Sequence, residues 1–175
     1  MARRGCADHP SSATIVGMND LDPASAESLH ARLTALEDLE ALKILKANYA
    51  LGSDRCLCTP SHEHALALAD LFTEDAVGDY GFIGRFAGRA ALADAFEHVH
   101  PAGTSWSTHY LTNSVVKVDG SHATGTWYFL IYAVPKGAPP GPPMNFFGSY
   151  EDTYVKTGAG WKIASLKVHY FMPPQ

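Results

Sequence analysis

The spacing of apolar residues changes once along this chain, and that change limits its fold more than any other feature. In the first part, apolar side chains recur every three or four residues, the period of amphipathic helices. Three helices are expected there, over residues 25–51, about 61–72 and about 89–98. Beyond Pro101 the period is two, which is typical of strands. Four strands are expected, over roughly residues 106–118, 122–134, 145–157 and 161–171.

Turn signals connect these elements. Gly52-Ser53 predicts the end of the first helix, and a short strand is expected around Ala76–Tyr80. Asp119-Gly120 and Gly158-Ala159-Gly160 predict hairpins between long strands. Helices followed by a run of antiparallel strands indicate an α+β fold, with three helices packed on a curved antiparallel sheet that encloses a pocket. A stiff, Pro-rich excursion over residues 135–143 could cover that pocket.

Composition limits the classes of partner. The 175 residues suit one domain, expected over 25–175, and the Ser-, Ala-, Asp-, Pro- and Gly-rich residues 1–24 predict a flexible N-terminal arm. With 13 Lys and Arg against 18 Asp and Glu, the net charge of -5 argues against nucleic-acid binding. No apolar stretch approaches the roughly 20 residues of a membrane helix. Three cysteines, an odd number, do not favour a disulfide framework, so a cytoplasmic location is expected.

Three polar residues are candidates for chemistry. Asp54 follows the predicted helix break, His109 lies near the start of a strand, and Tyr49 lies on the apolar stripe of the first helix. By alternation, Asn113 shares a strand face with His109. Each residue also has an ordinary structural interpretation, since carboxylates cap turns and a lone histidine is usually a satisfied structural residue.

The sequence does not favour a metal or a cofactor. Cys56, Cys58, His62 and His64 lie within nine residues, but only one residue separates the two cysteines, whereas zinc motifs have two to four. An ordinary loop and helix start is the better interpretation. No motif for a nucleotide, flavin or catalytic metal is present, so the side chains of an enzyme of this sequence would act without a cofactor.

Aromatic residues of the strands would form most of the sheet core and part of the pocket wall. Trp127 and Phe147 are candidates to contact a small hydrophobic substrate that contains a ring. Lys167 and His169 share a face of the last strand, and are either polar pocket residues or solvated residues of the outer face.

Several stretches resemble a SnoaL-like domain of the nuclear-transport-factor-2-like superfamily, and the resemblance covers roughly residues 30–171. The stretches are Leu42–Ala50 with Asp54, Ala67–Val77, Gly88–Leu92, Ser107–Asn113, Val118–Thr124 and Gly160–Ile163. The resemblance implies a cone of curved sheet closed by helices. Because the superfamily hosts many functions, the reaction is less specified than the fold.

Within the superfamily, the sequence is similar to the branch of scytalone dehydratase, bile acid 7α-dehydratase and hexachlorocyclohexane dehydrochlorinase. That likeness implies a pocket dyad of Asp54 and His109, with Tyr49 five residues before the Asp and Tyr80 as a second pocket tyrosine. His169 is a weak candidate for the second pocket histidine of scytalone dehydratase. Lys167 is a candidate for the late basic residue of the steroid enzyme.

The resemblance implies a cofactor-independent lyase, most simply a dehydratase acting on an aromatic or polycyclic compound. A carbon–carbon lyase that releases formaldehyde from a lignin-derived aryl diol remains an alternative, as does a double-bond isomerase. A non-catalytic ligand-binding module is the alternative of another class. The related enzymes also imply a homo-oligomer, with a trimer favoured over a dimer.

Overall fold

A computed structural model describes residues 23–137 and 141–171 of this chain. The chain divides into two compact units, residues 1–34 and 35–175, and the described part of the first unit is only the start of helix α1 (Pro23–Cys58). Most of the predicted arm, residues 1–22, lies outside the described residues, as do residues 138–140 of the Pro-rich excursion. Residues 23 and 24 belong to the helix rather than to an arm.

Helix α1 continues past the predicted break at Gly52-Ser53 and ends at Cys58, two residues before Pro60. Gly52 is a packing residue instead of a terminator. A Cβ atom at Gly52 would lie 2.8 Å from Leu68 Cδ1 of helix α2 (His62–Ala69). Because glycine has no side chain, Leu68 can pack directly against helix α1. The prediction was wrong because a packing glycine and a helix-ending glycine look alike in sequence. As a result, Asp54 lies on the helix itself.

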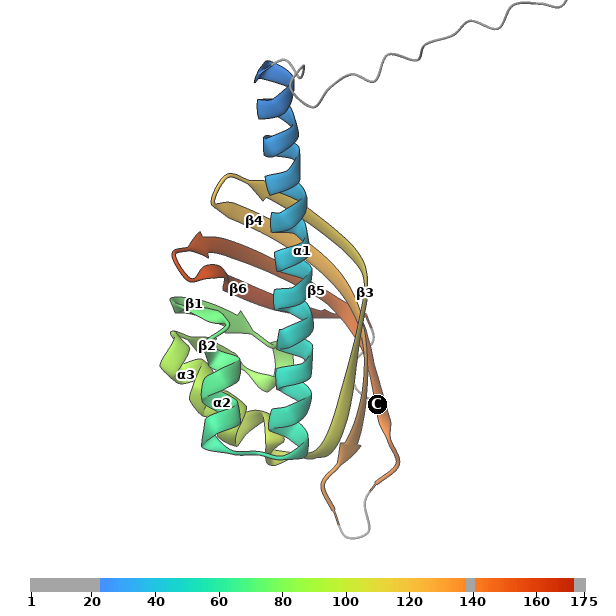
Figure 1. Ribbon diagram of the computed structural model, residues 1–175. Helices are drawn as coiled ribbons and strands as arrows, with labels where there is room; N and C mark the ends of the chain where they lie inside the picture. The colour runs from blue at the N-terminus through green and yellow to red at the C-terminus, as the bar shows by residue number, and fades with distance from the viewer. Residues whose placement is uncertain (1–22, 138–140, 172–175) are drawn as a thin grey trace, which may run out of the picture. The chain divides into compact units, whose positions relative to one another are not determined.

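Six strands form a single curved sheet (Figure 1). They are β1 (Phe72–Asp79), β2 (Arg85–Ala87), β3 (Thr104–Asp119), β4 (His122–Pro135), β5 (Met144–Thr157) and β6 (Gly160–Tyr170). The order across the sheet is β2-β1-β6-β5-β4-β3. Every neighbouring pair is antiparallel except β1 and β6, which are parallel. The sequence predicted the four long strands but missed β2.

The two predicted hairpin turns are present. Gly120 and Gly160 have φ values of 57° and 100°, a left-handed backbone that glycine adopts without steric penalty. A β-bulge in strand β3 was not predicted. The register of β3 with β4 shifts between Thr112 and Val115, and Asn113 has φ of 50°, which marks a β-bulge.

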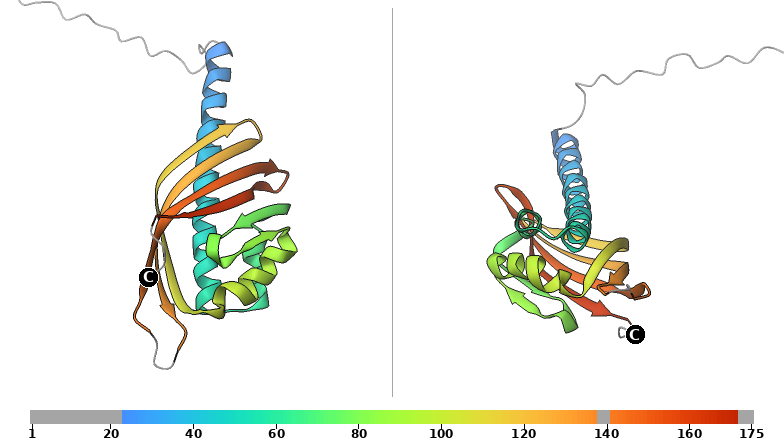
Figure 2. Two further views of the ribbon diagram at one scale, coloured as in Figure 1. Left: turned by 180° about the vertical axis from the view of Figure 1, so that it is seen from behind. Right: turned by 90° about the horizontal axis from the view of Figure 1, so that it is seen from below.

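Helix α1 crosses the concave face of the sheet, and three polar contacts secure it there (Figures 1 and 2). Asp38 accepts a hydrogen bond from the Trp161 indole of β6 at 2.8 Å. Lys46 forms an ion pair with Asp152 of β5 at 2.7 Å, and Asp54 accepts hydrogen bonds from β3. These helix residues are eight positions apart, or about 12 Å along the axis at 1.5 Å per residue. The apolar stripe is buried from Leu42 onward, while Leu36 is 63% exposed.

The shorter helices pack together against the β1 end of the sheet (Figure 2). The expected helix over residues 89–98 is three consecutive pieces: α3 (Arg89–Asp94), a π-helical turn (Ala95–Val99) and a 3-10 turn (His100–Ala102) that contains Pro101. Phe96 of the π-helical turn packs on Phe72, with ring centroids 5.9 Å apart. Among the helices described, none has a segment apolar enough, over sufficient length, to cross a membrane.

Candidate functional site

Helix α1, the turn after β1, the chain around His100 and the concave face of β3–β6 surround a cavity of about 420 Å³. Its polar side chains include those of Tyr49, Ser53, Tyr80, His100, Ser107 and His109. Its apolar and aromatic side chains include those of Phe82, Ile83, Ile131, Met144, Phe146 and Tyr170. A cavity of this size whose lining surface is mainly apolar suits a small, mainly apolar ligand.

Asp54 and His109, which are 55 positions apart in sequence, meet at this cavity. Asp54 Oδ1 lies 2.6 Å from His109 Nδ1, and Asp54 Oδ2 accepts a hydrogen bond from the His109 backbone N–H at 3.0 Å. The His109 side chain is only 7% exposed and that of Asp54 20%. A carboxylate that contacts both the ring and the backbone of one histidine holds that ring in a single orientation.

The contact also determines which nitrogen of His109 can act as a base. An ionised carboxylate can only accept hydrogen bonds, so Nδ1 carries the proton that faces Asp54. In the neutral ring, Nε2 is then the unprotonated nitrogen. Because His109 lines the cavity, the arrangement can remove a proton from a bound molecule and return it.

Ser107 completes this group, and sequence reasoning missed it. The Ser107 hydroxyl donates a hydrogen bond to Asp54 Oδ1 at 2.8 Å, and the residue is buried. It stands two positions before His109 on β3, so strand alternation would have placed both on one face. With this bond, Asp54 accepts three hydrogen bonds from β3.

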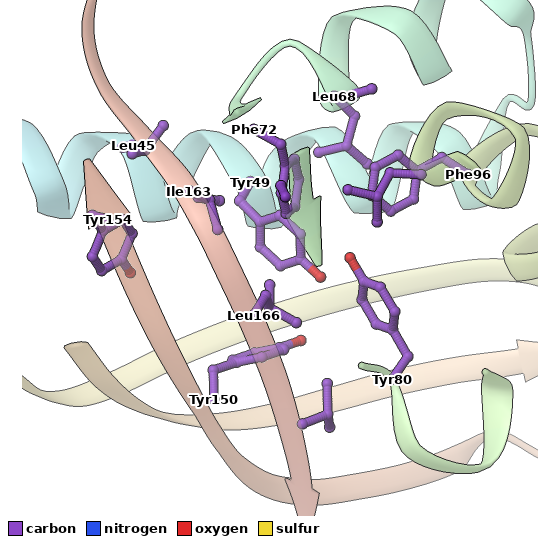
Figure 3. Packing of buried hydrophobic residues seen from close by; sticks show 14 of the residues in the cluster. Leu45, Tyr49, Leu68, Phe72, Tyr80, Phe96, Tyr150, Tyr154, Ile163 and Leu166 are labelled. Carbon is purple, nitrogen blue, oxygen red and sulfur yellow. The ribbon is translucent and has the colours of Figure 1, made fainter. Parts of the chain in front are cut away.

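Three tyrosine hydroxyls converge in the cavity that His109 also lines. Figure 3 shows Tyr49 and Tyr80 pointing toward one another, with the hydroxyl of Tyr150 close by. All three line the cavity, and burial raises the pKa of each well above the ordinary value. They therefore stay protonated and can donate hydrogen bonds. The Tyr80 hydroxyl is buried and has no hydrogen-bond partner among the described residues.

His100, not His169, is the second histidine of the cavity, which corrects the expectation from sequence. Its ring packs edge-on against Tyr80 with centroids 4.5 Å apart, and against Phe96 at 5.3 Å. Burial among these rings is the main cause that lowers the pKa of His100 to about 4, and the nearby His109 is the smaller cause. Near neutral pH His100 is therefore an uncharged hydrogen-bonding group. Its place after an irregular helix end left no periodic signal in the sequence.

His100 also predicts a loss of stability in acid. Between about pH 6.5 and pH 4 the unfolded chain binds a proton at His100 and the folded chain does not, so the free energy of unfolding falls as the pH falls. The full loss is about 3 kcal/mol, reached near pH 4. In His100→Phe this contribution is absent, so urea denaturation at a series of pH values should show the variant gaining stability relative to the parent below pH 6.5. A constant difference between the two proteins would contradict the assignment.

Two of the predicted substrate-binding residues lie away from the cavity. Phe147 is 40% exposed, because strand alternation turns its neighbour Phe146 inward. Trp127 is buried, but it is four residues from Ile131 along β4 and donates a hydrogen bond to the Tyr154 hydroxyl at 2.9 Å. The aromatic wall is made instead by Phe82, Phe146 and Tyr170, with Phe82 and Tyr170 centroids 4.9 Å apart.

The other three predicted binding residues also lie outside the cavity. Asn113 is exposed because the β-bulge at this position interrupts the alternation that begins at His109. Lys167 and His169 occupy the face of β6 opposite to Val168 and Tyr170. His169 Nε2 lies 3.0 Å from a carboxylate oxygen of Glu151 on β5. The solvated outer-face alternative therefore describes Lys167 and His169.

The Cys and His residues near the end of α1 have separate partners. The Cys58 thiol donates to the Ser107 carbonyl at 3.6 Å, and Cys56 is buried. His62 contacts Glu97 at 2.7 Å, whereas His64 Nδ1 contacts the Thr59 carbonyl at 2.7 Å. Within the described residues, no group of three or more His, Cys, Asp or Glu side chains is arranged to hold a metal ion.

Comparison with known proteins identifies the family and agrees with the fold. Residues 34–167 match the model of the SnoaL-like domain. A structure of a candidate aromatic ring hydroxylase from Novosphingobium aromaticivorans has 31% sequence identity, covering 80% of this chain and 93% of that chain, with a TM-score of 0.69. A candidate scytalone dehydratase from the same organism has 23% identity, 79% and 87% coverage, and a TM-score of 0.67. Hexachlorocyclohexane dehydrochlorinase from Novosphingobium barchaimii has 19% identity, 82% and 94% coverage, and a TM-score of 0.70. Among curated proteins there is no match.

Proposed function

This chain belongs to the SnoaL-like family and has the nuclear-transport-factor-2-like fold, and from that premise we propose that it is a cofactor-independent lyase. It eliminates water from a hydrophobic ring compound that bears a hydroxyl group β to a carbonyl. The observation that carries the proposal is the 2.6 Å contact between Asp54 and His109 at the wall of a mainly apolar cavity. The dehydratase and dehydrochlorinase names among the structural neighbours support elimination chemistry.

The proposed reaction needs one base and one set of hydrogen-bond donors. His109 Nε2 removes the proton between the carbonyl and the hydroxyl-bearing carbon, and the bonding electrons form an enolate. Asp54 stabilises the resulting imidazolium, and Tyr49 donates a hydrogen bond to the enolate oxygen. The enolate electrons then form the new double bond as the C–O bond breaks. His109 returns its proton to the departing hydroxide, so the products are an unsaturated ketone and water.

The test is a screen that reports which bond breaks. The full chain is incubated with a chelator and no added cofactor in deuterated water, with β-hydroxy ketones on fused rings and with aryl diols. Mass spectrometry is expected to show loss of water from a β-hydroxy ketone. The loss of water must be absent in His109→Ala and retained in Tyr110→Phe, whose side chain is 57% exposed on the opposite face of β3.

Other results would overturn the proposal in distinct ways. Release of formaldehyde from an aryl diol, dependent on His109, would assign the dyad to carbon–carbon cleavage. Deuterium exchange with a shifted double bond and no loss of water would assign an isomerase. Binding of ring compounds that is unchanged in His109→Ala, without turnover of any compound, would indicate a binding module.

The homo-oligomer implied by the family resemblance stays a proposal. Exposed aromatic side chains on the outer face of the long strands support it, because an apolar surface of this kind is usually covered in an assembly. They include Tyr110, Tyr128, Tyr132 and Phe147. Light scattering of the purified chain measures the number of copies.

A further inference from the structure

The described wall of the cavity carries no full charge except the one that His109 can acquire. Its lining residues include no Lys, Arg, Asp or Glu among those that the structure describes. The remaining ionisable groups of the wall are tyrosines and His100. Burial raises the pKa of the tyrosines and lowers that of His100, so near neutral pH all of them are uncharged.

The charges directly behind the wall do not favour an anion either. Asp54 contacts His109, and the buried pair of Lys46 and Asp152 lies against the rings of Tyr49 and Tyr150. Two carboxylates and one ammonium sum to -1 while His109 is neutral, and to zero when it is protonated. A ligand anion would lose its water shell without gaining a compensating cation.

The rest of the cavity matches an uncharged ring. The rings of Phe82 and Phe146 are nearly parallel, with 26° between their planes, and both lie beside Tyr170. The cavity is also lined by hydroxyl and imidazole groups, at Tyr49, Ser53 and His109. A ligand in this cavity therefore meets aromatic carbon and neutral donors, together with one base.

We infer that the substrate of this cavity is an uncharged ring compound, and that a carboxylate on the same ring excludes the compound from the site. This inference rests on the proposed function and narrows its substrate class to β-hydroxy carbonyl compounds whose ring carries no ionised group. Selectivity then arises from desolvation of the anion and from the carboxylate behind His109, not from the size of the ligand.

A matched pair of probes tests the inference by binding alone. 2-Naphthamide and 2-naphthoate have the same ring and nearly the same shape but differ by one charge at neutral pH. Calorimetric titration of the full-length protein at pH 7.5 is expected to give at least about tenfold weaker binding for naphthoate, since an unpaired buried ion is strongly disfavoured. Equal or tighter binding of naphthoate would overturn the inference.

Two lysine substitutions on neighbouring residues of β5 provide the control. Met144 lines the cavity, whereas Asn145 is exposed on the opposite face. Met144→Lys is expected to reduce or reverse the preference for the amide, and Asn145→Lys, with the same added charge, to leave it unchanged. An identical preference in both variants would contradict the role given to the wall.

The outcomes separate this inference from the proposed function. Preference for naphthoate together with His109-dependent loss of water from a ring ketone would overturn the inference and leave the lyase standing. Binding of neither probe would overturn the inference too, while the turnover screen decides the lyase independently.

Discussion

Lys46→Met is expected to lower the free energy of unfolding by about 3–5 kcal/mol, because it leaves a carboxylate buried without its partner. The side chains of Lys46 and Asp152 are both 0% exposed, with Nζ and Oδ2 2.7 Å apart. Among the described residues, Asp152 of the variant would keep only the hydrogen bond from the Tyr154 hydroxyl at 2.6 Å. Urea denaturation followed by tryptophan fluorescence measures the loss.

Two further variants show whether the buried charge is the cause. Lys43→Met, one turn away, removes an exposed ion pair with Glu40 and is expected to change stability by less than about 0.5 kcal/mol. Lys46→Met combined with Asp152→Asn removes both charges and keeps an acceptor for Tyr154, so it should recover much of the loss. A Lys46→Met protein as stable as Lys43→Met would contradict the burial argument.

The stability of Lys46→Met relative to the parent protein should depend on pH in a defined direction. Burial raises the pKa of Asp152, and Lys46 opposes that effect. Without Lys46 the folded carboxyl has a raised pKa, so its protonated form is favoured in the fold. The loss of stability in Lys46→Met should therefore shrink as the pH falls toward the range in which Asp152 is protonated, and grow as it rises.

Asp54→Asn is expected to lower turnover by about 10⁴-fold, the magnitude typical when the residue that orients a catalytic histidine becomes an amide. The introduced amide would donate to His109 Nδ1 and so place the imidazole proton on Nε2, the nitrogen that must act as a base. The effect should appear in kcat with little change in KM, because Asp54 does not line the cavity. Steady-state kinetics on the ketone found by the screen measure it.

His109→Ala should lower turnover by at least the roughly 10⁴-fold of Asp54→Asn, because it removes the base that Asp54 orients. Combining the two substitutions should add little, since both residues belong to one unit. Near-UV circular dichroism shows whether each variant keeps its fold, and Tyr110→Phe serves as the active control. If Asp54→Asn retains more than half of the parent turnover, the dyad is not the catalytic unit.

The long elements could be predicted from the sequence because their patterns are local. The four strands β3–β6 lie within about two residues of the predicted bounds, since alternation and Gly-containing turns specify both strand and hairpin. Helix α1 was recognised from its period, but its end was not. Whether Gly52 ends the helix or packs against Leu68 depends on the position of helix α2, which the local sequence around Gly52 does not specify.

The residues of the candidate site likewise divide into those that could be predicted from the sequence and those that could not. The placement of Tyr49, Tyr80 and His109 at one cavity, with Asp54 in contact with His109, was expected from the family resemblance, and their roles stay predictions. Ser107 shares a face with His109 and could have been found by alternation. His100 could not, because an irregular turn carries it into the cavity.

The sequence by itself determined the class of each long element and, through the resemblance, predicted the residues at the centre of the candidate site. Only the tertiary structure decided which strand faces line the cavity. The bulge at Asn113 interrupts the alternation of β3 and turns that side chain away from the cavity. On β5 a difference of one position separates Phe146, which lines the cavity, from Phe147, which does not. Tertiary structure also paired Lys46 with Asp152, which are 106 positions apart. Local periodicity reports whether a residue lies on an apolar face, whereas the partner of a buried charge depends on how the helix crosses the sheet.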